Sequence, residues 1–152
     1  MSKIAQRLAE LQISLPTAGA PAAAYVMSAQ TGNTLFLSGH IAKKDGKPLA
    51  GKLGLNMSTE EGKAAARSIA IDLLATMQAH LGSLDRVKRI VKVMSLVNST
   101  QEYTEHHLVT NGCSELLFEV FGEAGKHARS AFGVAQIPLG ACVEIELIAE
   151  VE

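Results

Sequence analysis

Features that would suit a nucleic-acid-binding protein are scarce in this sequence. Tryptophan is absent, and aromatic residues make up only 4% of 152 residues. Stacking on nucleobases depends on aromatic side chains. The formal net charge is -1. The densest basic cluster, residues 86–92, interleaves its charges with apolar residues, as one face of a strand would. The composition therefore disfavours nucleic acid as a partner.

Cysteine and long apolar runs are equally scarce. The two cysteines, Cys113 and Cys142, fit neither a zinc spacing nor a disulfide framework, so we expect small buried thiols in a reducing, cytoplasmic compartment. The start, MSKIAQRLAEL, lacks the continuous apolar region of a signal peptide. No apolar run approaches the length of a membrane span, which predicts no membrane contact.

The length and the 47% hydrophobic content suit a single domain over residues 1–152. Residues 3–12 have the apolar spacing of a short amphipathic helix, with Ile4, Leu8 and Leu11 on one face. The following stretch, SLPTAGAPAA, breaks helical structure with two prolines and a glycine. Residues 1–17 are therefore predicted to be an N-terminal helical extension.

The middle of the chain predicts a hairpin, a polar loop, a long helix and a strand. Residues 23–29 and 33–41 read as strands joined at Thr31-Gly32-Asn33, and the polar residues 43–47 follow. Ser58 and Glu61 form the capping-box pattern at the start of a helix over 58–82, which Gly82 would end. Residues 86–97 are rich in β-formers.

The last third predicts a polar connection, a second helix and a final hairpin. The connection spans 99–110, and the helix spans 111–121 with Asn111 as its N-cap. Residues 129–137 and 142–151 read as two strands paired about the Pro138–Gly140 turn, the second with clean apolar alternation. The pattern indicates an α+β fold in which two main helices pack on one face of a mixed sheet.

Two stretches carry a family resemblance. The run HARSAFGVAQIPLGACVEIELIAEV resembles the C-terminal signature of the RidA/YjgF family, also labelled endoribonuclease L-PSP, and LFLSGHIA resembles its Ser-Gly strand. Tyr25, thirteen residues before Ser38, and Asn111 match further landmarks over residues 18–151. Ala131, where deaminases often have cysteine, His40 in place of glutamine, the N-terminal helix and the 99–110 connection mark a divergent branch.

The resemblance implies a chorismate mutase-like fold and a homotrimer with ligand clefts between subunits. It implies hydrolysis of 2-imino or enamine acids to 2-oxo acids and ammonia, with no metal and no organic cofactor. Arg129 would bind the carboxylate of a small metabolite, and Glu144 would position water. The substrate-binding residues implied by family position are Tyr25, Ser38, Gly39, Asn111 and Ala131.

The two residues of the implied catalytic pair have the chemistry that this reaction needs. The planar guanidinium of Arg129 matches a carboxylate bidentately and stays charged, and Glu144 can place a water molecule by accepting a hydrogen bond from it. In a hairpin with roughly 3.3 Å per residue, Arg129 and Glu144 would lie roughly 20 Å apart in one chain. We therefore expect one cleft to take Arg129 from one subunit and Glu144 from another.

Other interpretations remain open at this point. One alternative is a non-catalytic carboxylate-binding protein, which needs Arg129 but not Glu144. Another is an endoribonuclease, for which the sequence offers no convincing acid–base pair of histidines. Without the resemblance, Arg129 would be an exposed ion-pair residue and Glu144 a solvated strand residue. The histidines His40, His106, His107 and His127 are expected on the surface or in loops, with no metal spacing. Ser38 has no triad partners.

Overall fold

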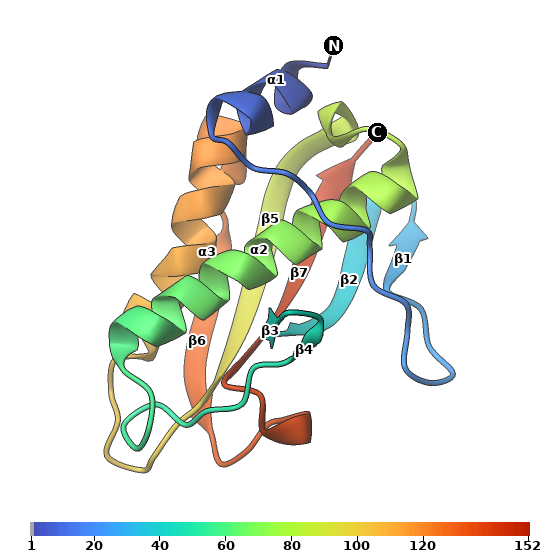
Figure 1. Ribbon diagram of the computed structural model, residues 1–152. Helices are drawn as coiled ribbons and strands as arrows, with labels where there is room; N and C mark the ends of the chain where they lie inside the picture. Colours follow the sequence, from blue (N-terminus) through green and yellow to red (C-terminus); the bar gives the residue numbers. More distant parts are fainter. Residues whose placement is uncertain (1) are drawn as a thin grey trace.

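A computed structural model describes residues 2–152, in which two long helices cover one face of a five-stranded sheet (Figure 1). In chain order the elements are α1 (Lys3–Glu10), β1 (Ser28–Thr31), β2 (Thr34–Ile41), β3 (Lys43–Lys44), β4 (Lys47–Pro48), α2 (Thr59–Leu81), β5 (Val87–Asn98), α3 (His106–Phe121), β6 (Ala128–Val134) and β7 (Val143–Val151). Helices α2 and α3 lie on the same side of the sheet, so the predicted α+β fold is confirmed.

The sheet has the order β1-β2-β7-β5-β6, and only β5 and β6 run parallel. The predicted pairing of the last two strands with each other is wrong, because β5 lies between them. β6 places Arg129 opposite Val93, and β7 pairs with β5 from the other side. Alternation predicted the two strands correctly, but it does not say which neighbour a strand hydrogen-bonds to.

Helix α2 has the ends that the sequence predicts. The Ser58 side chain accepts a hydrogen bond from the Glu61 amide, the Glu61 side chain accepts from the Ser58 amide, and Gly82 is left-handed at the C-terminus. Its apolar side packs on the sheet and on α3. At the contact with α3, a Cβ on Gly112 would lie 2.0 Å from the Lys63 carbonyl oxygen, so only glycine allows the two helices to approach this closely.

Three predicted boundaries are wrong. β1 spans Ser28–Thr31 rather than 23–29, because residues 22–25 form a bend in which the Tyr25 amide donates to the Ala23 carbonyl. α3 begins at His106 rather than at 111, so Asn111 lies inside the helix and is not its N-cap. The polar loop over 43–47 contains the short β3–β4 hairpin.

The N-terminal helix packs on the rest of the fold. Ile4 and Leu8 are buried, and the Asp85 carboxylate accepts hydrogen bonds from the amides of Lys3 and Ile4. Arg7 Nε donates to the carbonyl of Glu119 on α3. From α1 the chain continues as the strap, residues 16–27, which leads to β1 (Figure 1). No helix within residues 2–152 combines the length and apolar character needed to cross a membrane.

Candidate functional site

Arg129 lies on edge strand β6 and faces α3. Its Nη1 donates to Asn111 Oδ1 at 2.8 Å and to Ser114 Oγ at 3.2 Å. The two acceptors are three residues apart on α3, which puts them on one side of the helix. Within residues 2–152 no carboxylate lies within ion-pair distance of Arg129. Neutral oxygens orient the guanidinium, and its charge is not neutralised by a neighbour.

A histidine extends this hydrogen-bonded chain. Ser114 Oγ lies 2.9 Å from His127 Nε2, and His127 Nδ1 lies 2.7 Å from the Gly125 carbonyl oxygen. A carbonyl can only accept, so Nδ1 carries the hydrogen and Nε2 accepts from Ser114. Burial lowers the pKa of His127, and the charge of Arg129 lowers it further. His127 is therefore neutral, and it is half-buried rather than a surface residue.

The cysteine beside Arg129 is not a nucleophile. Cys113 is fully buried in α3, and burial raises the pKa of its thiol to about 12. Cys142 is also buried, and its pKa is raised to about 11 for the same reason. Because the thiolate is the reactive form, both side chains are inert apolar groups at neutral pH. The expectation that both thiols are buried is confirmed.

Glu144 lies in the second group of predicted residues, beside an irregularity in β2. The register between β2 and β7 shifts between Leu37 and His40. At this bulge a Cβ on Gly39 would lie 2.7 Å from Glu144 Oε1, so the glycine leaves room for the carboxyl group. Burial raises the pKa of Glu144, and the nearby Glu146 raises it further. The carboxyl is thus a better proton acceptor than an exposed glutamate.

Ser38 and Tyr25 complete this second group. The Ser38 amide donates to the Met27 carbonyl at 2.9 Å, and Ser38 Oγ donates to the Val26 carbonyl at 2.6 Å. These bonds hold the end of the strap against β2. Tyr25 precedes them and is 48% exposed, and its hydroxyl oxygen accepts from the Ala22 amide at 3.3 Å. Ser38 therefore fixes backbone, while the ring of Tyr25 is available to a ligand.

The two groups lie on opposite faces of the sheet. Arg129 is paired with Val93, and Glu144 is paired with Leu96, three residues further along β5. Paired residues share a face and odd spacings along a strand change it, so Arg129 points to the helical face and Glu144 to the open face. Ala131, two residues after Arg129, shares its face. The β6–β7 hairpin from which we predicted that Arg129 and Glu144 lie apart does not form. The two side chains are nevertheless apart within one chain, because they point to opposite faces of the sheet.

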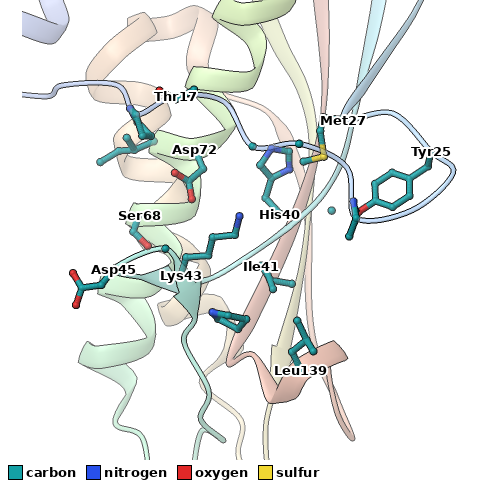
Figure 2. A pocket seen from close by; sticks show the side chains of 18 residues that line it. Thr17, Tyr25, Met27, His40, Ile41, Lys43, Asp45, Ser68, Asp72 and Leu139 are labelled. Atoms are coloured by element: carbon teal, nitrogen blue, oxygen red, sulfur yellow. The ribbon is translucent and has the colours of Figure 1, made fainter.

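His40 is a buried residue, not the surface residue that the sequence suggested. Its Nδ1 lies 2.6 Å from the Ser38 carbonyl oxygen and its Nε2 lies 2.8 Å from Thr76 Oγ1. Burial lowers its pKa. His40 borders a cavity of about 590 Å³, together with Tyr25, Gly39 and residues of α2 (Figure 2). Within residues 2–152 the histidines, cysteines and acidic residues form no group of three suited to a metal ion.

Sequence reasoning missed Ser114 and His127 as partners of Arg129. Ser114 is an ordinary polar residue in the middle of a helix, and His127 lies in a loop-like stretch, so neither has a local signal. Asn111 was identified by family position, but its contact with Arg129 depends on how α3 packs beside β6.

The chain is similar to known proteins in both sequence and structure. Residues 5–151 match the protein family described as "YjgF/chorismate mutase-like, putative endoribonuclease". "Protein TCP17" of Trypanosoma cruzi is 47% identical, with 97% of this chain and 94% of that protein covered. A "2-iminobutanoate/2-iminopropanoate deaminase" of Dermatophagoides farinae is 30% identical over 92% of this chain and 95% of that protein. A crystal structure of "a putative endoribonuclease" from Shewanella oneidensis superposes with a TM-score of 0.94 at 32% identity, covering 99% of this chain and 100% of that chain.

Proposed function

Because the chain belongs to the RidA/YjgF (YjgF/chorismate mutase-like) family, we propose that it hydrolyses small 2-imino acids to 2-oxo acids and ammonia. One observation carries the proposal. The guanidinium of Arg129 is oriented by Asn111 and Ser114, and no carboxylate in residues 2–152 neutralises it. Such a group binds a ligand carboxylate at little ordering cost. The named activity of the Dermatophagoides farinae relative supports this substrate class.

The proposed assembly is a homotrimer with clefts between subunits. Arg129 and Glu144 face opposite sides of their own sheet, so a shared site needs a second copy of the chain. The open face supports such an assembly, because it carries Phe36 and Phe132, which are 44% and 41% exposed. Covering these rings would remove apolar surface from water.

In the proposed reaction, Arg129 of one subunit binds the carboxylate next to the imine carbon. Glu144 of the neighbour accepts a proton from a water molecule, whose oxygen bonds to that carbon. The imine π electrons move to nitrogen, which takes up the proton that Glu144 accepted, and a carbinolamine forms. Glu144 then transfers the hydroxyl proton of the carbinolamine to the amino nitrogen. The C–N bond breaks with its electron pair going to nitrogen, ammonia leaves, and the C–O bond becomes the carbonyl of the 2-oxo acid. The raised pKa of Glu144 suits a group that accepts and returns a proton near neutral pH.

The other predicted residues shape the cleft. Tyr25 offers an exposed ring, Ser38 fixes the backbone, and Gly39 leaves space for the Glu144 carboxyl group. Ala131 lies on the same face as Arg129, and its small side chain leaves room beside the bound carboxylate. Because the imine is already electrophilic, placing water beside it is mainly a proximity effect.

The test couples the protein to an amino-acid oxidase or a threonine dehydratase that releases imine, and follows 2-oxo acid formation. The wild type should accelerate the final step, and Arg129→Ala should abolish the acceleration. Arg67→Ala is the matched control, because Arg67 forms an ion pair with Glu119 between the outer sides of α2 and α3. An acceleration retained in Arg129→Ala would contradict the role of Arg129.

The same preparations separate two other activities. If the protein binds 2-oxo acids without accelerating imine hydrolysis, its function is carboxylate binding and not catalysis. If RNA cleavage survives extensive purification and disappears in Arg129→Ala, the function is instead the endoribonuclease activity that the family description names.

A further inference from the structure

The cavity beside His40 lies away from Arg129, next to the end of β2 that the short edge strand β1 does not pair with. The strap, the end of β2, the β3–β4 hairpin and α2 enclose about 590 Å³, a size typical of small-molecule sites. β2 is separated from β6 by β7 and β5. Within one chain the cavity is therefore apart from Arg129. Tyr25 and Gly39 line it and also belong to the proposed cleft, whereas the proposed hydrolysis uses none of the charged groups on its α2 and β3 walls.

Two opposite charges face this cavity without partners. Asp72 on α2 is half-buried, and within residues 2–152 it makes no hydrogen bond or ion pair. Lys43 on β3 likewise forms no ion pair there. Figure 2 shows the Lys43 side chain extending toward Asp72 and His40, whereas Asp45 points away. Burial raises the pKa of Asp72, and the positive charge of Lys43 acts in the opposite direction.

The imidazole of His40, which also lines the cavity, already has its hydrogen-bond partners. Both ring nitrogens of His40 have hydrogen-bond partners, Ser38 and Thr76, and its pKa is lowered by burial, so it is neutral. A ligand would thus meet one free carboxylate and one free ammonium. Leaving such a half-buried charge without a partner is costly, and a ligand that pairs with it recovers that cost.

Apolar side chains form much of the remaining wall. They belong to the strap, β2, α2 and the turn after β6, and include Met27, Ile41, Ile71 and Leu139. Leu139 is 75% exposed in the isolated chain, and its backbone is left-handed, with φ of 62°. An aliphatic group of a ligand would cover this apolar surface while its charged end meets Asp72 and Lys43.

We propose that this cavity binds a small zwitterion, a free α-amino acid with an aliphatic side chain. Its ammonium pairs with Asp72, its carboxylate pairs with Lys43, and its side chain lies against Met27, Ile41 and Ile71. A simple carboxylate would leave Asp72 unpaired, and a simple amine would leave Lys43 unpaired. Because Gly39 lines the cavity and also lies against Glu144, the occupant lies close to the proposed catalytic glutamate.

The test compares three probes of matched shape by calorimetric titration of the full chain. They are L-leucine, 4-methylpentanoate, which lacks the ammonium, and 3-methylbutylamine, which lacks the carboxylate. Leucine should bind at least about tenfold more tightly than either, since each charged hydrogen bond is worth roughly 1.5–3 kcal/mol. All titrations are repeated in Arg129→Ala, where leucine affinity should be unchanged because the charged ends of leucine pair with Asp72 and Lys43 and not with Arg129.

Two variants identify the charges. Asp72→Asn should lower the affinity for leucine to that for 4-methylpentanoate, and Lys43→Met should lower it to that for 3-methylbutylamine. Lys47→Met is the control, because Lys47 lies on the same hairpin but does not line the cavity. Equal affinities for the three probes, no leucine binding at millimolar concentration, or unchanged leucine affinity in folded Asp72→Asn and Lys43→Met would each overturn the proposal. Loss of leucine binding in Arg129→Ala would do the same.

Discussion

The guanidinium of Arg129 is positioned by neutral groups before any ligand arrives. Asn111 and Ser114 accept hydrogen bonds from its Nη1, and Ser114 is in turn fixed by the neutral ring of His127. An arginine held by a carboxylate would lose much of its attraction for an anion. This arrangement keeps the full positive charge for the ligand while restricting the side chain to one orientation.

Removing one of these acceptors should weaken ligand binding. Ser114→Ala takes away one partner of Arg129 and the donor to His127 Nε2. A net hydrogen bond is worth about 0.5–1.5 kcal/mol, so we expect the dissociation constant for a 2-oxo acid to rise roughly 2- to 12-fold. Equilibrium titration of the purified variant measures this change.

The matched control is Ser28→Ala, which removes another serine–histidine contact. Ser28 Oγ lies 3.0 Å from His80 Nδ1 at the opposite edge of the sheet. The affinity of Ser28→Ala for the 2-oxo acid should equal that of the wild type. If Ser114→Ala binds as tightly as Ser28→Ala, Ser114 does not position Arg129.

At the residue scale, the sequence singles out Arg129 and Glu144 as candidates but not the side chains that contact Arg129. Both candidates come from a match to a family signature, and their catalytic roles stay predictions. Ser114 and His127 carry no such signal, since their role depends on the tertiary contact between α3 and β6. Asn111 was predicted as a helix cap and lies instead in the second turn of α3, where it contacts Arg129.

Among the elements, the bulge in β2 has the most direct bearing on Glu144. The shifted register brings Gly39 against the carboxyl group, with no side chain between them. The backbone of Gly39 is not in the left-handed region, so another residue could adopt it. What requires glycine here is the space that Glu144 occupies.

Gly39→Ala should therefore reduce catalysis more than stability. The added Cβ would lie 2.7 Å from Glu144 Oε1, and the end of a flexible side chain can move away. We expect Tm to change by a few degrees at most and kcat for imine hydrolysis to fall about tenfold or more. KM should change little, because Arg129 is untouched. Steady-state kinetics and thermal unfolding measure the two effects.

A double variant distinguishes this explanation from general damage. If Gly39→Ala acts by displacing Glu144, then adding it to Glu144→Gln should cost little further activity. Independent, multiplying losses in the double variant would show that Gly39 acts by another route.

The bounds of elements with strong local sequence patterns were predicted well, but the pairing of the strands was not. The capping box and Gly82 defined α2 almost to the residue, and alternation defined β7. The start of α3 was missed because Glu105, its N-cap residue, makes no side-chain capping bond. The supposed hairpin of β6 and β7 was wrong because strand pairing depends on long-range contacts that local patterns do not contain.

For the whole molecule, the decisive feature is that Arg129 and Glu144 face opposite sides of one sheet. A monomer cannot bring both to one substrate without unfolding the sheet. The proposed activity therefore requires assembly, and loss of assembly should remove the activity even where each subunit is folded.

Mixing two inactive variants tests this requirement. Arg129→Ala and Glu144→Gln should each be inactive alone. After co-refolding in equal amounts, a cleft is intact only when the Glu144→Gln chain supplies its Arg129 and the Arg129→Ala chain supplies its Glu144. In a cyclic trimer about one quarter of the clefts meet this condition. We expect about a quarter of the wild-type rate.

The two parental variants refolded separately and then combined without exchange serve as the control. They should stay inactive. Inactivity of the co-refolded mixture, with native mass spectrometry showing mixed trimers, would mean that Arg129 and Glu144 do not act in the same cleft.

The position of β7 in the sheet order also bears on how the sheet can assemble. β7 is the strand that joins β2 to β5. Until residues 143–151 pair with both, the β1–β2 hairpin and the β5–β6 pair are not joined by sheet hydrogen bonds, and each exposes an unpaired strand edge. A chain without a paired β7 is thus two incomplete half-sheets, and both edges are open to other chains until β7 is in place.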